Sequence, residues 1–281
     1  MWFAEALTAA ILFGIAGVFF KIVARDNGSL SHLLFGMYLT GAAGFAIWAS
    51  IEGRWVFDAS HLIAGVFIGF GSAFGNLLFL KAIKIGPTSL SSPLVNLNVV
   101  LVVLMAVFLY HESLTAREIV AICLLIGAIM FLPIDPHESV AIKNPTWYLL
   151  IIAAIFAIFF RNGGLKITEE LNLDNTMVLF YGYMYALAGF GLVVPGENAV
   201  ARTLRFKSLR LGLYTGVLSF VSMTLYAEAL SNGPASLVSP IFSTSSLILA
   251  TLCIVFFKER LSLFQVIALV LLFCGLILIK I

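Results

Sequence analysis

The stretch GPTSLSSP, residues 86–93, recurs 147 residues later as GPASLVSP, residues 233–240. Both copies lie between long apolar runs, and the match continues on either side without a gap. The same shift aligns further pairs of residues: Gly65 with Gly212, Gly69 with Gly216, Ser72 with Ser219, and Glu112 with Glu259. Self-similarity of this length at a constant offset indicates that the chain contains two copies of one structural unit.

Upstream of this region the two halves align with a shift of 145 residues. This shift places Lys21 on Lys166, Phe35 on Phe180, Tyr38 on Tyr183 and Gly44 on Gly189. A two-residue difference in the length of one loop reconciles the two offsets. We therefore expect a first repeat over residues 1–133 and a second repeat over residues 146–281.

The composition indicates that both repeats lie in a membrane. The chain is 62% hydrophobic and 11% charged, with a mean hydropathy of +1.09. A helix needs about 20 apolar residues to cross a bilayer, and ten runs of about this length are present, at residues 2–24, 32–51, 61–84, 87–110, 115–133, 146–168, 174–195, 208–231, 234–257 and 262–280. The runs are continuous rather than alternating, which predicts helices rather than a barrel.

The fold expected from these runs is an all-α integral membrane protein of ten transmembrane helices, arranged as two five-helix repeats. Because five is an odd number, the second repeat must cross the membrane in the opposite orientation to the first. Inverted repeats are typical of secondary transporters, in which the two halves exchange roles so that a central site opens to either side.

Three motifs within this frame resemble those of a known family. Gly86-Pro87, Ser92-Pro93 and Glu112-Ser113-Leu114 recur as Gly233-Pro234, Ser239-Pro240 and Glu259-Arg260-Leu261. The chain is similar over its whole length to the EamA-type transporters of the drug/metabolite transporter superfamily. The resemblance implies transport of amino acids, metabolites, sugars or drugs through a central cavity, driven by an ion gradient or by exchange. It also implies a multi-pass protein of a bacterial or archaeal cell membrane.

Two prolines are predicted to act as helix hinges. Pro93 and Pro240 lie about two turns inside the fourth and ninth predicted helices, so each removes a backbone hydrogen bond. The carbonyls of Ser89 and Ser236 lose their donors as a result. We expect a kink in both helices, beside a wet cavity where water or substrate can satisfy the freed carbonyls.

Polar residues on the same two helices form the expected cavity walls. Ser92 and Asn96 share one face of the fourth helix, and Ser239 and Ser243 share the matching face of the ninth. In the alternative interpretation the serines bond the preceding turn and Asn96 bonds a neighbouring helix. Asn98 points away from this face and is expected to cross-link helices.

Three residues outside these helices are further candidates for binding substrate. Asn76 lies past the middle of the third predicted helix. Tyr181 and Tyr185 are one turn apart on the seventh helix and could stack on a substrate, although core or interfacial aromatic residues are commoner. The repeated glycines of the third and eighth helices are expected to allow close helix packing instead.

Ionisable residues within a membrane are costly and are functional candidates. Arg161, inside the sixth predicted helix, would either face the cavity and bind a carboxylate or phosphate, or extend its charge toward the interface. Glu228, near the end of the eighth helix, is a possible proton-coupling carboxylate or an interfacial residue. Glu112 and Glu259 precede the fifth and tenth helices, and we expect them to complement the N-terminal dipoles of these helices.

Several function classes find no support in the sequence. The four histidines are scattered near loops and form no metal-ligand or nucleophile constellation, so no metal, cofactor or enzymatic activity is expected. A net charge of +2 gives no nucleic-acid patch. The expected partners are a small-molecule substrate and membrane lipids, with the chain acting as a monomer or a homodimer. The main alternative function is a lipid or drug translocator or scramblase.

The loop charges disagree with the orientation that the resemblance implies. With a cytoplasmic N-terminus, the basic cluster Arg202, Arg205, Lys207 and Arg210 lies outside the cell, as do Lys258 and Arg260. The residues left inside are Arg54, Arg117, Lys166 and Lys280. The positive-inside rule prefers the reverse arrangement, but we retain the orientation of the family.

Overall fold

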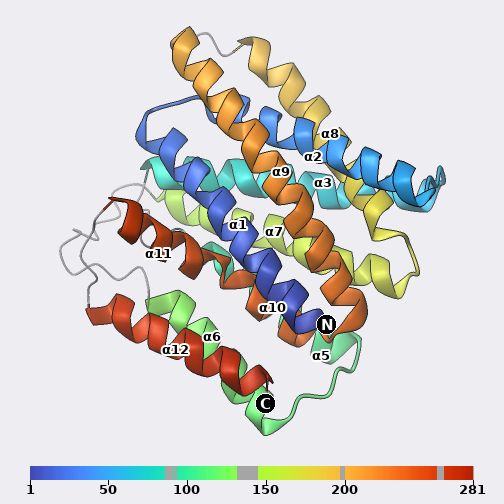
Figure 1. The fold of residues 1–281 in the computed structure, drawn as a ribbon, viewed down its shortest axis with the longest axis vertical. Coiled ribbons are helices and arrows are strands. Elements are labelled where there is room, and N and C mark those ends of the chain that lie inside the picture. The colour runs from blue at the N-terminus through green and yellow to red at the C-terminus, as the bar shows by residue number, and fades with distance from the viewer. Residues whose placement is uncertain (86–90, 92–93, 132–144, 197–199, 258–262, 281) are drawn as a thin grey trace.

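The computed structural model describes residues 1–85, 91, 94–131, 145–196, 200–257 and 263–280. This part of the chain is helical and contains no strand (Figure 1). Its helices are α1 (Trp2–Arg25), α2 (Leu30–Glu52), α3 (Ala59–Ile85), α5 (Asn98–Leu109), α6 (Ala116–Phe131), α7 (Thr146–Glu170), α8 (Asn175–Val193), α9 (Arg202–Asn232), α10 (Ala235–Ser243), α11 (Ser245–Phe257) and α12 (Leu263–Lys280), with a 3-10 turn at Val194–Gly196.

Six of these helices, α1 to α3 and α7 to α9, are long and apolar enough to cross a membrane. Their outward surfaces carry exposed large hydrophobic side chains such as Phe67, Phe70 and Leu192, as expected for residues that face lipid. The chain is therefore a multi-pass membrane protein built from helices.

The fourth and ninth predicted spans are each interrupted. In the fourth span a turn at Leu97 precedes α5, and in the ninth a turn at Thr244 separates α10 from α11. Leu97 and Thr244 are related by the 147-residue shift. At both turns a backbone N–H bonds the carbonyl three residues earlier, Leu97 to Leu94 at 3.1 Å and Thr244 to Ile241 at 3.1 Å.

The interruption of the ninth span lies four residues beyond the predicted hinge. Pro240 remains inside α10, so the helix continues for one turn past it. At Thr244 the hydroxyl also donates to the Ile241 carbonyl, at 2.6 Å, and this contact stabilises the tighter turn. The hinge role of Pro240 stays a prediction, and Pro93 lies outside the described residues.

The two repeats pack against each other with internal symmetry. Helix α1 packs on α9, as α7 packs on α3, and α2 packs on α9, as α8 packs on α3. The same symmetry exchanges α2 with α8 and α6 with α12, so the contact within each of these two pairs is its own counterpart. In Figure 1 the pair of α6 and α12 lies apart from the other helices, which form the main bundle. Each repeat therefore buries its apolar surfaces largely against the other.

Hydrogen bonds obey the same symmetry. The Tyr38 hydroxyl is bonded to the Ser72 hydroxyl at 2.9 Å, and the Tyr183 hydroxyl to the Ser219 hydroxyl at 2.6 Å. The shifts of 145 and 147 residues convert the first pair into the second. The sequence repeat is therefore a structural repeat, and the two tyrosine rings meet edge to face at 5.2 Å where the repeats join.

The repeated glycines lie where helices approach most closely. Gly69 lies against the backbone of Gly182 on α8, and Gly216 lies against the backbone carbonyl of Met37 on α2. Gly182 and Met37 are themselves related by the 145-residue shift. The expected packing role of these glycines agrees with both contacts.

We predict that Gly69→Ala lowers the stability of the protein by about 1–3 kcal/mol, the usual cost of overpacking. The new Cβ would meet the backbone of Gly182, which cannot move aside as a flexible side chain could. The thermal unfolding midpoint of the purified protein measures this effect. Gly189→Ala is the matched control, because it makes the same change within α8 and no atom lies within 4 Å of its new Cβ. Equal midpoints for the two variants would contradict the packing role.

The order of the helices defines two faces. Trp2, Lys280 and the connections 53–58, 110–115 and 171–174 lie at one face, called here the termini face. The connection 26–29 and the 3-10 turn Val194–Gly196 lie at the opposite face. At the opposite face Lys207 of the predicted basic cluster forms an ion pair with Asp26 at 2.5 Å, which offsets part of the positive charge there.

Candidate functional site

A cavity of about 100 Å³ lies between the interrupted helices. Helices of the main bundle and both interruptions supply its walls. The lining residues are Phe13, Gly17, Phe20, Asn76, Phe79, Val95, Asn96, Asn98, Ile158, Arg161, Asn162, Phe242, Ser243, Ser245, Ser246 and Leu249. Polar groups from both repeats therefore converge on one space in the middle of the protein.

The cavity extends from the middle of the helices toward the opposite face. Helix α1 runs away from the termini face, and its lining residues Phe13, Gly17 and Phe20 lie at or beyond its midpoint. Helix α3 runs the same way, and its lining residues Asn76 and Phe79 also lie in its second half. The described lining contains no residue from the first half of α3.

Arg161 is the charged residue of the described lining. Its side chain belongs to α7 and is 6% exposed. The Nε atom donates to Asn162 Oδ1 at 2.9 Å, and the guanidinium carbon lies 5.3 Å from the centroid of the Phe13 ring. The lining that the structure describes contains no Asp or Glu. The guanidinium therefore lies deep in the bundle among neutral groups.

A chain of amide hydrogen bonds joins Arg161 to the interruption in the first repeat. Asn162 Nδ2 donates to Asn98 Oδ1 at 3.0 Å, and Asn98 Nδ2 donates to the Val95 carbonyl at 2.8 Å. Asn98 is the first residue of α5. It does cross-link helices, as expected, and it also lines the cavity, which the sequence did not indicate.

The interruption in the second repeat contributes serines. Ser243 ends α10, and Ser245 and Ser246 begin α11. The Ser246 hydroxyl donates to the Ser243 carbonyl at 3.0 Å, within one turn. The two interruptions therefore place the start of α5, the end of α10 and the start of α11 at the cavity wall.

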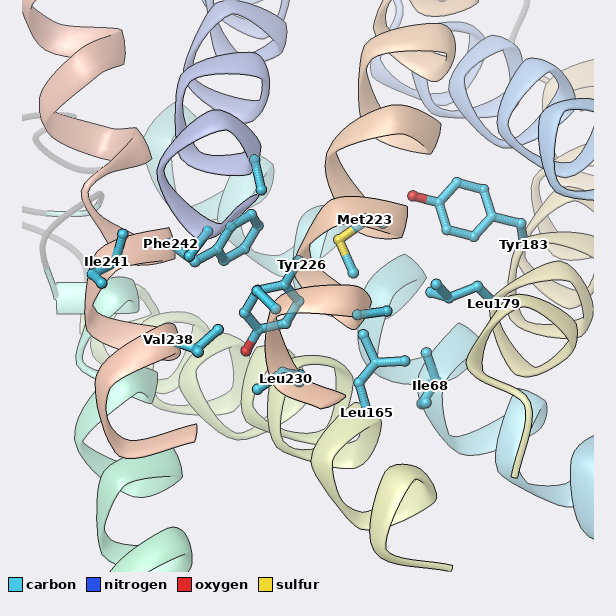
Figure 2. Close-up of a cluster of buried hydrophobic side chains, with 14 of the residues drawn as sticks. Ile68, Leu165, Leu179, Tyr183, Met223, Tyr226, Leu230, Val238, Ile241 and Phe242 are labelled. Carbon is cyan, nitrogen blue, oxygen red and sulfur yellow. The ribbon is translucent and has the colours of Figure 1, made fainter. Parts of the chain in front are cut away.

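Aromatic side chains separate the cavity from the termini face. Figure 2 shows Tyr226 and Phe242 side by side, and their rings stack with centroids 4.3 Å apart. Phe13 lies 5.3 Å from Phe242 on the other side. The Tyr226 hydroxyl is bonded to Ser239 at 2.9 Å. These contacts hold α1, α9 and α10 together below the cavity.

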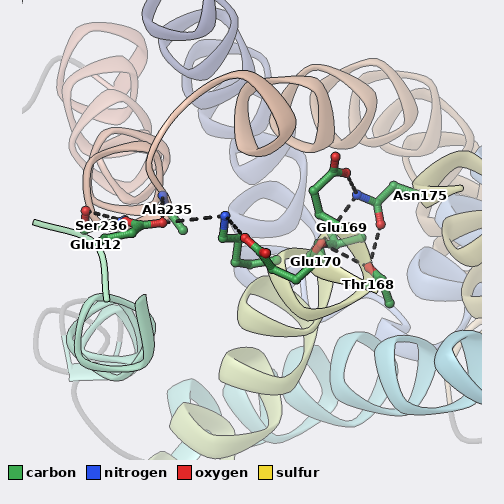
Figure 3. Close-up of polar contacts among 9 residues, drawn as sticks. Glu112, Thr168, Glu169, Glu170, Asn175, Ala235 and Ser236 are labelled. Carbon is green, nitrogen blue, oxygen red and sulfur yellow. Dashed lines mark hydrogen bonds and ion pairs between the residues drawn. The ribbon is translucent and has the colours of Figure 1, made fainter. Parts of the chain in front are cut away.

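A second closure lies nearer the termini face and joins the two repeats (Figure 3). The Glu112 carboxylate accepts the backbone N–H groups of Ala235 and Ser236, both at 2.9 Å, and the Ser236 hydroxyl at 2.7 Å. Lys166 Nζ lies 3.6 Å from Glu112 and 2.6 Å from Glu170. We call the contact among Glu112, Ala235, Ser236 and Lys166 the Glu112 latch.

The position of Glu112 corrects one expectation. We expected this carboxylate to complement the N-terminus of the helix that follows it, now α6. Instead it accepts hydrogen bonds at the N-terminus of α10, in the other repeat. Thr115 and Glu118 cap α6, with the Thr115 N–H donating to Glu118 at 2.7 Å. Glu259 lies outside the described residues.

Further contacts join the repeats at the termini face. His61 Nε2 accepts the backbone N–H of Asp174 at 3.0 Å, and His61 Nδ1 lies 2.8 Å from Asp58 Oδ1. Since Nε2 accepts, Nδ1 must carry the proton and donate to Asp58. The backbone N–H and ring of His61 hold the pKa of the Asp58 carboxyl below its usual value.

Four of the predicted binding residues line the cavity: Asn76, Asn96, Arg161 and Ser243. The others lie elsewhere. Ser239 is buried against Tyr226, the Tyr181 hydroxyl donates to the Val56 carbonyl at 2.7 Å, and Tyr185 is 40% exposed on the outer surface. Glu228 is exposed near the end of α9. Ser92 lies outside the described residues. The coupling role of Glu228 and the binding role of every other predicted site residue stay predictions.

Four polar lining residues were not selected from the sequence: Asn98, Asn162, Ser245 and Ser246. Asn162 stands next to Arg161, and this adjacency was the available signal for it. Ser246 lies seven residues after Ser239 and three after Ser243, so it continues the serine face predicted for the ninth helix. This helical spacing was the available signal for it.

Comparisons with known proteins identify a family and a fold. The model of the EamA-like transporter family matches residues 1–134 and 145–281. No curated protein matches the chain. One solved structure, titled only as the crystal structure of a protein, is similar with a TM-score of 0.79 at 15% identity, over 100% of this chain and 98% of that chain. This similarity shows the fold.

Proposed function

Because the chain belongs to the EamA-like transporter family of the drug/metabolite transporter superfamily, we propose that it is a secondary active transporter of small organic solutes. An amino acid or a related metabolite is the favoured class. The proposal includes ten transmembrane helices in two inverted repeats, at residues 1–133 and 146–281, with the fourth and ninth helices interrupted. The observation that carries it is the polar cavity between those interruptions.

Alternating access is the mechanism that we propose. The cavity extends toward the opposite face, while the Tyr226 contacts and the Glu112 latch close the termini face. The sequence repeat assigns Lys21, Ser89 and Glu259 as the counterparts of Lys166, Ser236 and Glu112. Alternating access requires that closures at the two faces open in turn, so the Glu112 latch would open in the state that admits solute from the termini face.

The size of the cavity supports a small solute over a drug. Sites for drug-sized molecules have volumes of about 300–1,000 Å³, whereas this cavity has about 100 Å³. Its walls also come from the inside of the helix bundle, which supports a solute pathway over a lipid pathway along the surface. A lipid or drug translocator or scramblase of the same fold is the alternative function.

Other parts of the proposal follow from the family. We propose that the protein acts in a bacterial or archaeal cell membrane, as a monomer or homodimer, with membrane lipids and a small-molecule substrate as its partners. The EamA-like family is a transporter family rather than an enzyme family. No nucleic acid or cofactor enters the proposed mechanism.

The proposal predicts saturable flux of a ligand that the protein binds. Purified protein is first screened by thermal shift against amino acids, organic acids, sugars, nucleotides and cationic drugs, because a ligand of the folded state raises its apparent stability. The ligand found is then labelled and its uptake measured in proteoliposomes against empty liposomes. We expect uptake that saturates with concentration. Lipid flux in the same vesicles without solute uptake would favour the scramblase function instead.

A further inference from the structure

The charge of Arg161 is not balanced by the part of the chain that the structure describes. A guanidinium keeps its proton at any pH at which the protein is folded. No carboxylate of the described residues lies within 4 Å of the Arg161 nitrogens, and its side chain contacts Asn162 and the Phe13 ring. A buried ion without a counter-ion strongly destabilises the folded protein, because an interior of low dielectric solvates the charge much less well than water does.

The other described groups at the cavity do not neutralise Arg161. Asn96, Asn98 and Ser243 are neutral. A guanidinium without a counter-ion attracts an anion, and it can bind a carboxylate through two parallel hydrogen bonds. An ammonium group would meet the positive charge of Arg161 without a carboxylate in the described lining.

From this arrangement we infer that the substrate is a small organic monoanion whose carboxylate binds Arg161, and that the carrier exchanges such anions rather than releasing one and returning empty. This inference rests on the proposed transport function. Of the two substrate classes named there it retains the related metabolite, as a hydroxy, keto or simple short-chain carboxylate, and sets aside the zwitterionic amino acid.

The lining also limits the rest of the molecule. Phe20, Phe79 and Leu249 supply apolar surface in the part of the cavity toward the opposite face. A carboxylate on Arg161 would direct a short hydrocarbon chain toward these side chains. The cavity volume of about 100 Å³ suits a molecule of a few carbon atoms, given that water occupies about 30 Å³ in the liquid.

Exchange follows from the same charge. Alternating access requires an intermediate in which the cavity is closed to both faces and water is largely excluded. With a monoanion bound, Arg161 is paired in this intermediate; in the empty carrier its charge is alone in a low-dielectric space. The loaded carrier therefore changes conformation faster than the empty carrier.

A matched set of ligands tests the charge assignment on the unmodified protein. Lactate, lactamide and alanine share a three-carbon skeleton and differ in charge, and a panel of two- to five-carbon monocarboxylates with their amides extends the comparison. We expect at least one monocarboxylate to raise the thermal unfolding midpoint at a concentration at which its amide and its amino-acid analogue do not. Arg161→Gln should remove this shift. The inference is overturned if no monocarboxylate acts, or if the amides act equally.

Vesicle flux tests the exchange. Uptake of the labelled monocarboxylate that binds is compared between proteoliposomes loaded with the same unlabelled anion and empty ones, with the membrane potential clamped. We expect uptake into loaded vesicles to be at least tenfold faster. Equal uptake into both overturns exchange and leaves the transport function standing. Binding without uptake into either would instead contradict the transport function.

Discussion

Replacing Arg161 with glutamine is expected to make the empty protein more stable and to abolish transport. The Gln Nε2 atom occupies the place of the Arg Nε atom on Cδ, so the hydrogen bond to Asn162, now 2.9 Å long, can be kept while the charge is removed. Neutral replacement of buried ionic groups often stabilises proteins by about 1–4 kcal/mol. We expect a gain in this range without ligand and a loss of transport of at least about 100-fold, as for truncation of a buried charge partner.

The thermal unfolding midpoint without ligand and the initial rate of solute uptake measure the two effects. Arg210→Gln is the control, since Arg210 is exposed on α9 and its Nε donates to the Tyr214 hydroxyl, one turn away in the same helix. It should leave both quantities nearly unchanged. A lower unfolding midpoint for Arg161→Gln than for the unmodified protein would show that the charge of Arg161 is balanced within the protein and stabilises the fold. A gain in stability with a loss of activity is the usual signature of a site whose strain serves function.

Much of this architecture could be predicted from the sequence, because the two halves of the chain can be aligned with each other. Tyr38 and Ser72 align with Tyr183 and Ser219, and both pairs form the same hydrogen bond. The position of Arg161 in the cavity was also accessible, because an ionisable residue far from a helix end is costly in a membrane unless it faces a polar space inside the bundle.

Other features could not be predicted, because they depend on contacts between residues that are far apart in the sequence. The dipole rule assigned Glu112 to the helix that follows it, but its donors Ala235 and Ser236 lie more than 120 residues away. The interruption at Thr244 lies one turn beyond Pro240, because a proline removes one hydrogen bond but does not fix where the next turn re-forms. Tyr181 has the helical spacing of a cavity residue, yet the same spacing suits its actual contact with Val56.

The Glu112 latch should control access from the termini face. Glu112→Ala removes the acceptor for two backbone N–H groups at the start of α10 and a partner of Lys166. Hydrogen bonds to a charged group contribute about 1.5–3 kcal/mol each. Loss of about 3 kcal/mol from one of two conformations shifts their ratio by more than 100-fold. We therefore expect the termini face to open and solute uptake to fall at least tenfold.

Thiol labelling at Ser239 can detect this opening. Ser239 is 2% exposed between the latch and the cavity, so Ser239→Cys, in a background without the native cysteines, should react slowly with a water-soluble thiol reagent. Adding Glu112→Ala should increase the labelling rate at least tenfold. Glu118→Ala is the matched control, because Glu118 also caps a helix at the termini face but does so within its own repeat. If both variants lose stability and neither changes labelling, Glu112 acts as a helix cap alone. If only Glu112→Ala increases the labelling rate, the Glu112 carboxylate controls the opening of the termini face. It can do so because it stabilises the N-terminus of α10, in the other repeat, only when the two repeats are closed against each other.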